Sequence, residues 1–431
     1  MTLTHQTSIM LDRSVTIVGS GLDFPTSLAF APDGRLFVAE SGLPFAGARP
    51  GGRVWEVPPD GERRLIASGF PAPLNGLTWH DDRLIVASLG RIDWLEVNGT
   101  RTTILEGLPT GGNYHTNMVA VGGDGWLYFS QGALTNSGVV GLDAMELAWQ
   151  GRITPQFDIP GLTVDLTGAA FETADPRSPD PQARATTGAF APFGQVLAAG
   201  TCIAGAVPCT AAVMRVRPDG TGLELVAWGL RNAFGLGFVP DGRLLAVDQG
   251  ADDRGSRPLG NVPDLLFEVR PGAWYGWPDF IGGEPITDPR YRPTHGSEPA
   301  FVLANHDALP PPMSPLFRFR SHVAATKFAV MPGGGPTCIA LALFGDERPM
   351  TAPLGPQIGR SVVLLDVNAG RLRPLPMTGL ARPIDVACHP QDGSLHVVDF
   401  GHFEMRGGGK FEAAAGTGRV LRAVPNEEDR A

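Results

Sequence analysis

The sequence predicts an all-β protein, a six-bladed β-propeller with four-stranded antiparallel blades. The first observation is a hairpin pattern, in which an apolar strand, a turn that is mostly Asp-Gly and a second apolar strand follow one another, repeated six times. The second is a composition with 57 Gly, 40 Pro and only 18% charged residues, which is typical of short strands joined by tight turns. The third is an additional strand after several of the hairpins. The hairpins cover residues 28–42, 77–90, 119–132, 236–250, 328–345 and 386–401.

Each repeat offers about four short strands, the content of one propeller blade. Third strands are expected at 52–57, 212–216 and 361–367. One blade alone cannot bury both of its apolar faces, so we expect six blades to stack into a closed ring. Residues 14–18 and 418–424 both resemble strands, and their pairing within one blade would close that ring. Two β-sandwiches would explain the hairpins equally well, but not their shared strand endings.

The repeat predicts a single propeller domain over residues 1–431, with long loop insertions at about 133–210 and 281–325. Both stretches depart from the hairpin pattern, and the second is rich in Pro, as in Pro310-Pro311-Pro312. Long loops on a rigid scaffold are where binding surfaces are commonly built. We therefore expect these insertions to decide the substrate, whose identity the sequence does not give.

The overall charge and composition exclude several classes of protein. The formal net charge is −10 and no long Lys/Arg run is present, which argues against nucleic acid or a membrane as a partner. No apolar run is long enough for a transmembrane helix, and the first residues do not resemble a secretory signal, so a soluble, cytoplasmic protein is expected. The four cysteines lack a CxxC spacing, and Cys202 and Cys209 are close enough either to pair or to remain reduced thiols.

Polar residues recur where the first strand of each hairpin begins and where the second ends. In a propeller these ends meet at one mouth of the central channel, which suggests a site for a polar small molecule or a metal ion. Satisfying backbone groups, or holding water in the channel, is the structural alternative for each residue. The strand beginnings contribute Thr26, Ser27, Asn75, His115, Asn117, Arg231, Asn232, His322, Lys327, Arg382 and Asp385, and the strand ends Glu40, Ser88, Gln131, Asp248, Gln249 and Asp399.

The Arg231-Asn232 pair stands out because the hairpin around it recurs and the pair does not. Arg231 could hold an anionic oxygen with its fork of N–H donors, or form a salt bridge to Asp248 or Asp252. His115 could act as a general base or be structural. Gly250-Ala251-Asp252-Asp253 offers the oxygen ligands that Ca²⁺ prefers, although an acidic turn is usually just solvated. The aromatic cluster Trp274-Tyr275-Gly276-Trp277 could form a stacking wall or fill a core.

At these residues the chain resembles the glucose/sorbosone dehydrogenase family, which includes the soluble PQQ-dependent aldose dehydrogenases. The resemblance spans about residues 15–424 and is most specific over 228–280. Its motifs are Gly229-Leu230-Arg231-Asn232, Asp248-Gln249-Gly250, Tyr275-Gly276-Trp277-Pro278, His115-Thr116-Asn117 and Arg382-Pro383.

The resemblance implies a PQQ-dependent oxidoreductase that oxidises a sugar or related alcohol by hydride transfer to the quinone, with Ca²⁺ as a second cofactor and a separate electron acceptor. His115 would be the catalytic base and Arg231 would assist it. The implied cofactor contacts are Arg231, Asn232, Gln249, Gln131, Asn117, Tyr275, Trp277 and Arg382, and the implied metal ligands are Gly250, Ala251 and Asp252. It also implies a periplasmic or secreted enzyme.

The sequence departs from the family at two points in the site. Tyr114 occupies the position of the family's catalytic His, and His115 is displaced by one residue, which in an extended segment turns its side chain to the other face. The fifth blade lacks a clear basic cluster, with Arg348 and Arg360 as the nearest candidates for the PQQ carboxylates.

Two other functions remain open. The first is a Ca²⁺-dependent lactonase or esterase of the gluconolactonase type, in which a metal ion at the axis polarises a carbonyl group. Its oxygen ligands would be Glu40, Asn75, Asn117, Asn232 and Asp399. The second is a non-catalytic propeller that binds a ligand on one face.

Overall fold

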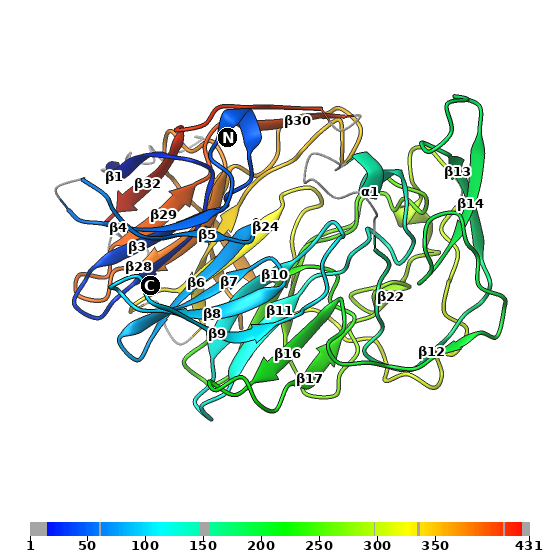
Figure 1. Ribbon diagram of the computed structural model, residues 1–431, viewed down its shortest axis with the longest axis horizontal. Coiled ribbons are helices and arrows are strands. Elements are labelled where there is room, and N and C mark those ends of the chain that lie inside the picture. The colour runs from blue at the N-terminus through cyan, green and yellow to red at the C-terminus, as the bar shows by residue number, and fades with distance from the viewer. Residues whose placement is uncertain are drawn as a thin grey trace, which may run out of the picture.

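Six four-stranded antiparallel sheets stand around one axis, as predicted (Figure 1). The structure is a computed structural model that describes residues 15–59, 62–146, 156–296, 298–333, 337–407 and 410–424. Neighbouring innermost strands contact one another around the whole ring, in the order β2, β6, β10, β18, β24 and β28. The ring therefore closes, and the innermost strands are short sheet edges protected by their neighbours.

Five blades are continuous in the chain, from the innermost strand outward. The first contains β2 (Pro25–Phe30), β3 (Leu36–Glu40), β4 (Gly52–Val57) and β5 (Arg64–Phe70). The second contains β6 (Leu74–His80), β7 (Arg83–Ser88), β8 (Arg91–Leu95) and β9 (Arg101–Glu106). The third contains β10 (Thr116–Val121), β11 (Leu127–Gln131), β16 (Ala212–Val216) and β17 (Glu224–Trp228). The fourth contains β18 (Ala233–Phe238), β19 (Leu244–Asp248), β20 (Leu265–Glu268) and β23 (Phe317–Arg318). The fifth contains β24 (Ala325–Val330), β25 (Cys338–Leu343), β26 (Ser361–Asp366) and β27 (Arg371–Leu375).

The sixth blade joins the two ends of the chain. It consists of β28 (Pro383–Cys388), β29 (Leu395–Asp399), β32 (Gly418–Ala423) and β1 (Val15–Leu22). β1 pairs antiparallel with β32, with Val15 opposite Ala423 and Ile17 opposite Leu421. The predicted closure by N- and C-terminal strands is confirmed.

The blades stack through apolar faces on both sides of each sheet. All six residues of β25 are buried, because this strand lies inside its own blade and is covered by a neighbouring blade on either face. Such a strand carries a continuous apolar run rather than an alternation. At the narrow centre even a methyl group is too large: a Cβ on Gly235 of β18 would lie 2.4 Å from the backbone oxygen of Thr326 in the next blade.

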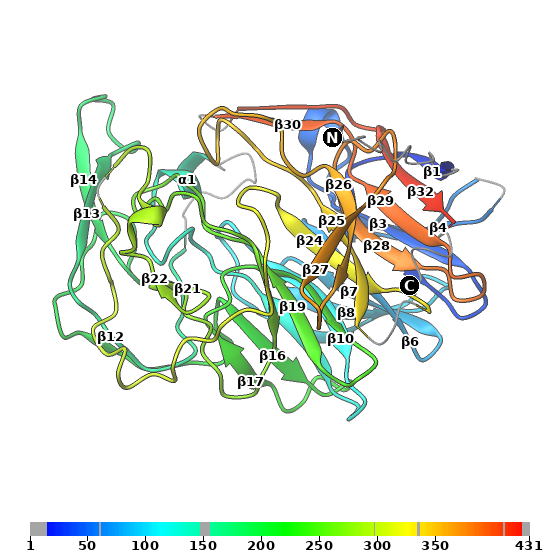
Figure 2. The ribbon, with the colours of Figure 1, turned by 180° about the vertical axis from the view of Figure 1, so that it is seen from behind.

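Two long segments leave the ring on the same side (Figures 1 and 2). Residues 132–211, between β11 and β16, contain α1 (Leu142–Glu146) and the strand pairs β12–β15 (Val164–Asp165 with Cys202–Ile203) and β13–β14 (Ala170–Ala174 with Arg184–Gly188). The segment between β20 and β23 contains β21 (Phe280–Ile281), β22 (Glu284–Pro285) and η3 (Pro289–Tyr291). The two segments bind each other through a Leu166–Leu303 bridge, so they form one overhanging layer.

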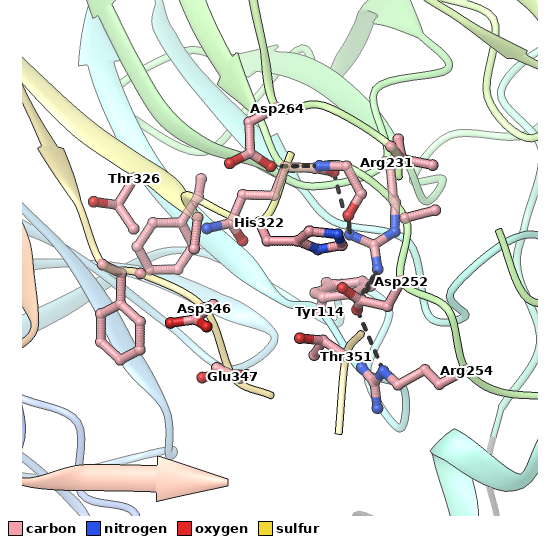
Figure 3. A pocket seen from close by; sticks show the side chains of 18 of the residues that line it. Tyr114, Arg231, Asp252, Arg254, Asp264, His322, Thr326, Asp346, Glu347 and Thr351 are labelled. Atoms are coloured by element: carbon pink, nitrogen blue, oxygen red, sulfur yellow. Dashed lines mark hydrogen bonds and ion pairs between the residues drawn. The ribbon is translucent and has the colours of Figure 1, made fainter. Parts of the chain in front are cut away.

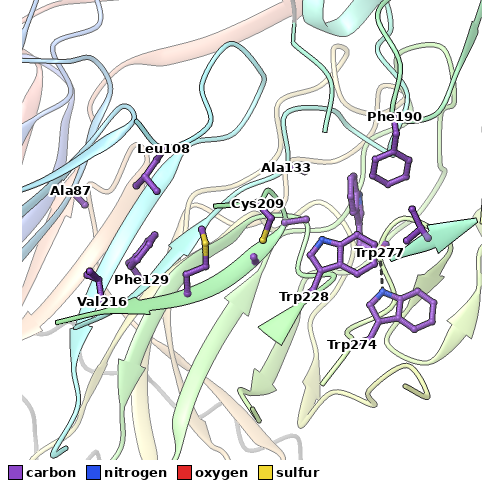
Figure 4. Packing of buried hydrophobic residues seen from close by; sticks show 14 of the residues in the cluster. Ala87, Leu108, Phe129, Ala133, Phe190, Cys209, Val216, Trp228, Trp274 and Trp277 are labelled. Carbon is purple, nitrogen blue, oxygen red and sulfur yellow. Dashed lines mark hydrogen bonds between the residues drawn. The ribbon is translucent and has the colours of Figure 1, made fainter. Parts of the chain in front are cut away.

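Tryptophans attach this layer to the propeller (Figure 4). Trp228 at the end of β17 and Trp274 stack with ring centroids 6.5 Å apart, and Trp277 belongs to the same buried cluster. The Trp274 indole N–H donates to the backbone oxygen of Trp277 at 3.1 Å. The aromatic cluster of the sequence thus packs mainly as core.

A hairpin of β30 (Phe403–Gly407) and β31 (Lys410–Ala413) lies between β29 and β32 and packs on the short helix η1 (Phe45–Gly47). All four cysteines, Cys202 and Cys209 included, are free thiols. Among the helices of the described residues, none is long and apolar enough to span a membrane.

Candidate functional site

A cavity opens at the mouth of the central channel, where the innermost strands begin (Figure 3). It has two lobes of about 230 Å³ each, which we call the Arg231 lobe and the His115 lobe after a residue that lines only one of them. Tyr114, Gln249, Arg254 and Glu347 line both lobes, so the two adjoin each other. This volume suits a ligand of sugar size or a compact aromatic cofactor.

Arg231 is a central element of one wall, but its N–H donors are directed into the protein. Its side chain is only 4% exposed. Nε donates to the Asn136 backbone oxygen at 2.9 Å, and Nη1 donates to the backbone oxygens of Gln249 and Gly250. Nη2 donates to the Tyr114 hydroxyl and to the Asn136 side-chain oxygen, and lies 3.1 Å from an Asp252 oxygen. A guanidinium has five N–H groups, and these contacts use all of its nitrogens.

The Asp248 carboxylate fixes the Arg231-Asn232 backbone. It accepts from the backbone N–H of Arg231 at 3.2 Å and of Asn232 at 2.7 Å. Burial raises the pKa of Asp248 to about 7. Two other blades show the same type of contact. The Glu40 carboxylate accepts from the backbone N–H of Asp23, and the Asp399 carboxylate accepts from the backbone N–H of Arg382. These acidic strand ends of the predicted polar ring are therefore structural, because they satisfy the backbone of the strand beside them.

Amide side chains link four blades beneath the cavity. Asn75 donates to Asn117 at 3.2 Å, Asn117 donates to Asn232 at 2.9 Å, and Asn232 donates to Gln249 at 2.8 Å. Gln249 in turn donates to the Ala325 backbone oxygen at 3.2 Å. A row in which each amide orients the next presents a polar floor of fixed geometry.

Lys327 occupies the axis itself. Its Nζ donates to the backbone oxygens of Thr26, at 2.8 Å, and of Asn75, and lies 3.5 Å from an Asp385 oxygen. Burial lowers the pKa of Lys327 and raises that of Asp385. A cation is thus already built into the centre of the ring, supplied by a side chain.

The residues predicted as metal ligands are brought together, but two of them face guanidinium groups. The Gly250 backbone oxygen accepts from Arg231. An Asp252 oxygen lies 3.1 Å from Arg231 and 3.3 Å from Arg254. Ala251 lines the Arg231 lobe beside them. In the part of the chain that the structure describes, no three His, Cys, Asp or Glu side chains form a group suited to a metal ion.

The remaining predicted residues are only partly assembled at the cavity. His115 and Asn117 line the His115 lobe. Gln131 lies beneath it, accepting from the Thr116 hydroxyl at 2.9 Å. Tyr275 and Trp277 line a smaller recess that adjoins the Arg231 lobe at Arg231 and Gly250. The Tyr275 hydroxyl donates to the Glu268 backbone oxygen.

Arg382 lies outside the lining of both lobes and is fully buried. It donates to the backbone oxygens of Phe344, Gly345 and Asp346, and Nη2 donates to Glu404 at 2.9 Å. These contacts fix the loop that follows β25. That loop continues into Glu347, so Arg382 acts on the cavity through its wall.

Several groups that line the cavity did not emerge from the sequence as site residues. Asp264 holds the Gly250 turn against β24 by accepting from Gly250 N–H at 2.8 Å and Ala325 N–H at 2.7 Å, and burial raises its pKa to about 6. Arg254 Nη1 is buried and has no hydrogen-bond partner in the described part of the chain. The acidic pair Asp346-Glu347 follows β25 much as Asp248 ends β19, and this parallel could have identified the pair as site residues from the sequence.

His322, which the sequence did place in the polar ring, lies in the Arg231 lobe (Figure 3). Its backbone is in the left-handed region with φ of 69°, and Ala324 follows with φ of 47°. Such a conformation is uncommon for residues other than glycine and is held by the surrounding structure. Burial lowers the pKa of His322, which favours the neutral imidazole.

No family model and no curated protein matches the sequence. Among solved structures, the chain is similar to a PQQ-bound aldose sugar dehydrogenase from Streptomyces coelicolor, with 17% identity, TM-score 0.55, and 95% of this chain and 97% of that chain covered. It is similar to the holo PQQ domain of a pyranose dehydrogenase from Coprinopsis cinerea, with 14% identity, TM-score 0.56, and 95% of each chain covered. An oxidoreductase described as a glucose dehydrogenase from Thermus thermophilus shares 19% identity, TM-score 0.53, over 95% of this chain and 99% of that chain. These likenesses establish a shared six-bladed propeller over nearly the whole chain.

Proposed function

We propose that the axial cavity is the active site of an oxidoreductase that acts on a sugar or a related alcohol, with PQQ as its cofactor. The observation that carries the proposal is a cavity with a polar floor and partly apolar walls at the mouth of a propeller shared with PQQ-bound sugar dehydrogenases. Its wall contains the Arg231-Asn232 pair and its floor the amide row.

The cavity offers a group suited to part of PQQ, which is a planar quinone bearing three carboxylates. Arg254 Nη1 is a buried guanidinium nitrogen without a hydrogen-bond partner among the residues that the structure describes, and Arg254 lines both lobes. A buried cation of this kind favours an anionic oxygen. Arg231 adds positive charge but contributes no unused nitrogen, so Arg254 is the better candidate for a direct cofactor contact.

The cofactor would supply a two-electron acceptor beside the substrate. The protein would supply the polar floor and carboxyl groups that bind hydroxyls, and a group that takes the hydroxyl proton. Calcium has less support, because the oxygens of Gly250 and Asp252 are engaged by arginine.

Reconstitution tests this proposal. Purified protein is titrated with PQQ, with and without Ca²⁺, and binding is followed by calorimetry while dye reduction is measured with a panel of sugars and alcohols. We expect binding and sugar-dependent dye reduction. Binding should tighten as the pH falls through about 6, because protonation of Asp264 removes a negative charge near an anionic cofactor. Absence of both binding and dye reduction would reject the proposal.

The lactonase alternative lacks an assembled site. Glu40 pairs with Arg53 at 2.7 Å, and Asp399 pairs with Arg419 at 2.7 Å. The three predicted asparagine ligands bond to one another or to Gln249, and the axis is occupied by Lys327. Lactone hydrolysis lost on adding a chelator would nevertheless favour it over the oxidoreductase.

A further inference from the structure

Glu347 is distinguished from the other acidic residues at the cavity by its lack of partners. Asp252 and Asp264 each bind arginine or backbone N–H groups, and Asp346 lies 3.7 Å from Arg348. The Glu347 carboxyl, by contrast, makes no hydrogen bond or ion pair with any residue that the structure describes. It lines both lobes, so it stands where they meet.

The backbone around Glu347 is firmly held, although its side chain is not. Arg382 binds the three backbone oxygens that precede it. The Glu347 backbone oxygen accepts from Met350 N–H at 3.0 Å and from Thr351 N–H at 3.2 Å. A carboxyl group on a firmly held backbone, with its oxygens unused, is suited to bind a ligand hydroxyl and accept its proton.

Burial raises the pKa of Glu347 above that of an ordinary Glu, and the nearby arginines only partly oppose this. A carboxylate with a raised pKa is a stronger base than one in water. The titratable and charged groups around it come from several blades and the segments that join them. They are Tyr114, Asp252, Arg254, His322, Asp346, Arg348, Arg382 and Glu404.

We propose that Glu347, rather than His115, accepts the hydroxyl proton of the substrate in the oxidation assigned to this cavity. The inference rests on the proposed function. In the step, the substrate O–H bond breaks and its proton passes to the carboxylate. The electron pair of the substrate C–H bond would pass as hydride to a bound quinone, which leaves a carbonyl group on the substrate. Arg382 is a positioning residue for Glu347 and does not contact the substrate.

His115 and His322 are the competing bases. His115 lines only the His115 lobe and is 6% exposed. His322 lines only the Arg231 lobe. Glu347 is the one of the three that borders both spaces, so it can contact a substrate in one lobe and face an acceptor in the other.

Kinetics of Glu347→Gln, which keeps the size of the side chain and removes the base, test this role. With PQQ-loaded protein we expect kcat to fall about 100- to 10,000-fold. PQQ affinity by calorimetry should change less than about 3-fold, and the acidic limb of the kcat/KM profile should disappear. His115→Gln and His322→Gln should keep that limb. The control is Glu224→Gln, an exposed residue on β17.

A second readout does not depend on activity. The pKa of Glu347 is higher in the folded protein than in the unfolded chain, so the unfolded chain loses this proton at a lower pH. The free energy of unfolding therefore falls as the pH rises from about 4.5 through the raised folded pKa. Glu347→Gln should therefore raise Tm by about 1–2 °C at pH 8 and leave it unchanged at pH 4. Glu224→Gln should show no such difference.

The outcomes separate the two claims. Wild type that neither binds PQQ nor reduces dye overturns the proposed function, and the base with it. Turnover by Glu347→Gln within about tenfold of wild type overturns only the role of Glu347. Loss of the acidic limb in His115→Gln or His322→Gln instead assigns the base to that residue. A Tm for Glu347→Gln below that of wild type at pH 8 means that the carboxylate is a structural contact, which also overturns the proposal.

Discussion

At the scale of single residues, the two arginines of the cavity wall differ in what remains for a ligand. Arg231 binds the Gln249-Gly250 turn, Asn136 and Tyr114. Arg254 contacts Asp252, and its buried Nη1 has no hydrogen-bond partner within the described ranges of the chain. We therefore expect Arg231 to maintain the shape of the site and Arg254 to contact the ligand.

Substitution by glutamine should separate these roles. Arg231→Gln removes a buried charge from several acceptors and should lower the free energy of unfolding by about 3–5 kcal/mol. Arg254→Gln should cost about 1 kcal/mol, yet weaken PQQ binding at least tenfold by removing the cation nearest the anionic ligand. Urea unfolding and calorimetric titration measure the two quantities. Equal loss of PQQ affinity in two folded variants would contradict the assignment.

The sequence could identify the residues of the wall but not their partners. The pattern indicates Arg231 and Asn232 because they precede a hairpin that recurs without them, and Gln249 because it is a polar residue at the end of the second strand. Glu347 is not predicted as a site residue because the turn of its hairpin is degenerate. A single carboxyl group is also not recognisable as a site residue from sequence unless other candidate ligands lie beside it. Whether an N–H or an oxygen is left unused depends on contacts between blades, which a local pattern does not contain.

At the scale of elements, Asp158 joins both ends of the first inserted segment to each other. It accepts from Leu134 N–H at 2.6 Å, from the Thr135 hydroxyl and from the Thr210 hydroxyl at 2.9 Å. Residues 134 and 210 lie close to the two points where this segment leaves and rejoins the third blade.

Asp158→Ala should loosen the inserted segment and leave the ring intact. Three buried donors lose their acceptor, at a cost of about 2–4 kcal/mol. Hydrogen exchange should therefore quicken in β13 and β14, while the strands of the blades keep their protection. Asp175→Ala, at an exposed turn of the same segment, is the control. Faster exchange across all six blades would show that the segment is not an independent unit.

The strands of the ring were predictable, and those of the overhanging layer were not. Hairpins such as β18–β19 carry apolar runs around a tight turn, where Gly242 adopts a φ of 89°. The pairs β12–β15 and β21–β22 have two residues per strand, too few to show a period. The hairpin of β30 and β31 is not predicted, because it lies between β29 and β32, where the repeat pattern of the sixth blade contains no further strands.

At the scale of the whole molecule, Lys327 connects four of the six blades. It projects from β24 to the backbone of β2 and β6 and to Asp385 on β28. Asp385 extends the network by accepting from the Ser27 hydroxyl at 2.7 Å and Leu28 N–H at 3.1 Å. The ring is thus held at its centre by one buried ion pair, in addition to its closure by β1 and β32.

A double-mutant cycle measures this central link. Lys327→Met leaves Asp385 buried without its counter-ion, so we expect a loss of about 3–5 kcal/mol in the free energy of unfolding. Asp385→Asn should also destabilise the ring, because the Lys327 charge then lies unpaired. The double variant should cost clearly less than the sum, since neither charge is left alone in the interior. Denaturant unfolding of the four proteins gives the coupling energy. Additive losses would mean that the two side chains act separately and that the ring depends on apolar packing and strand closure.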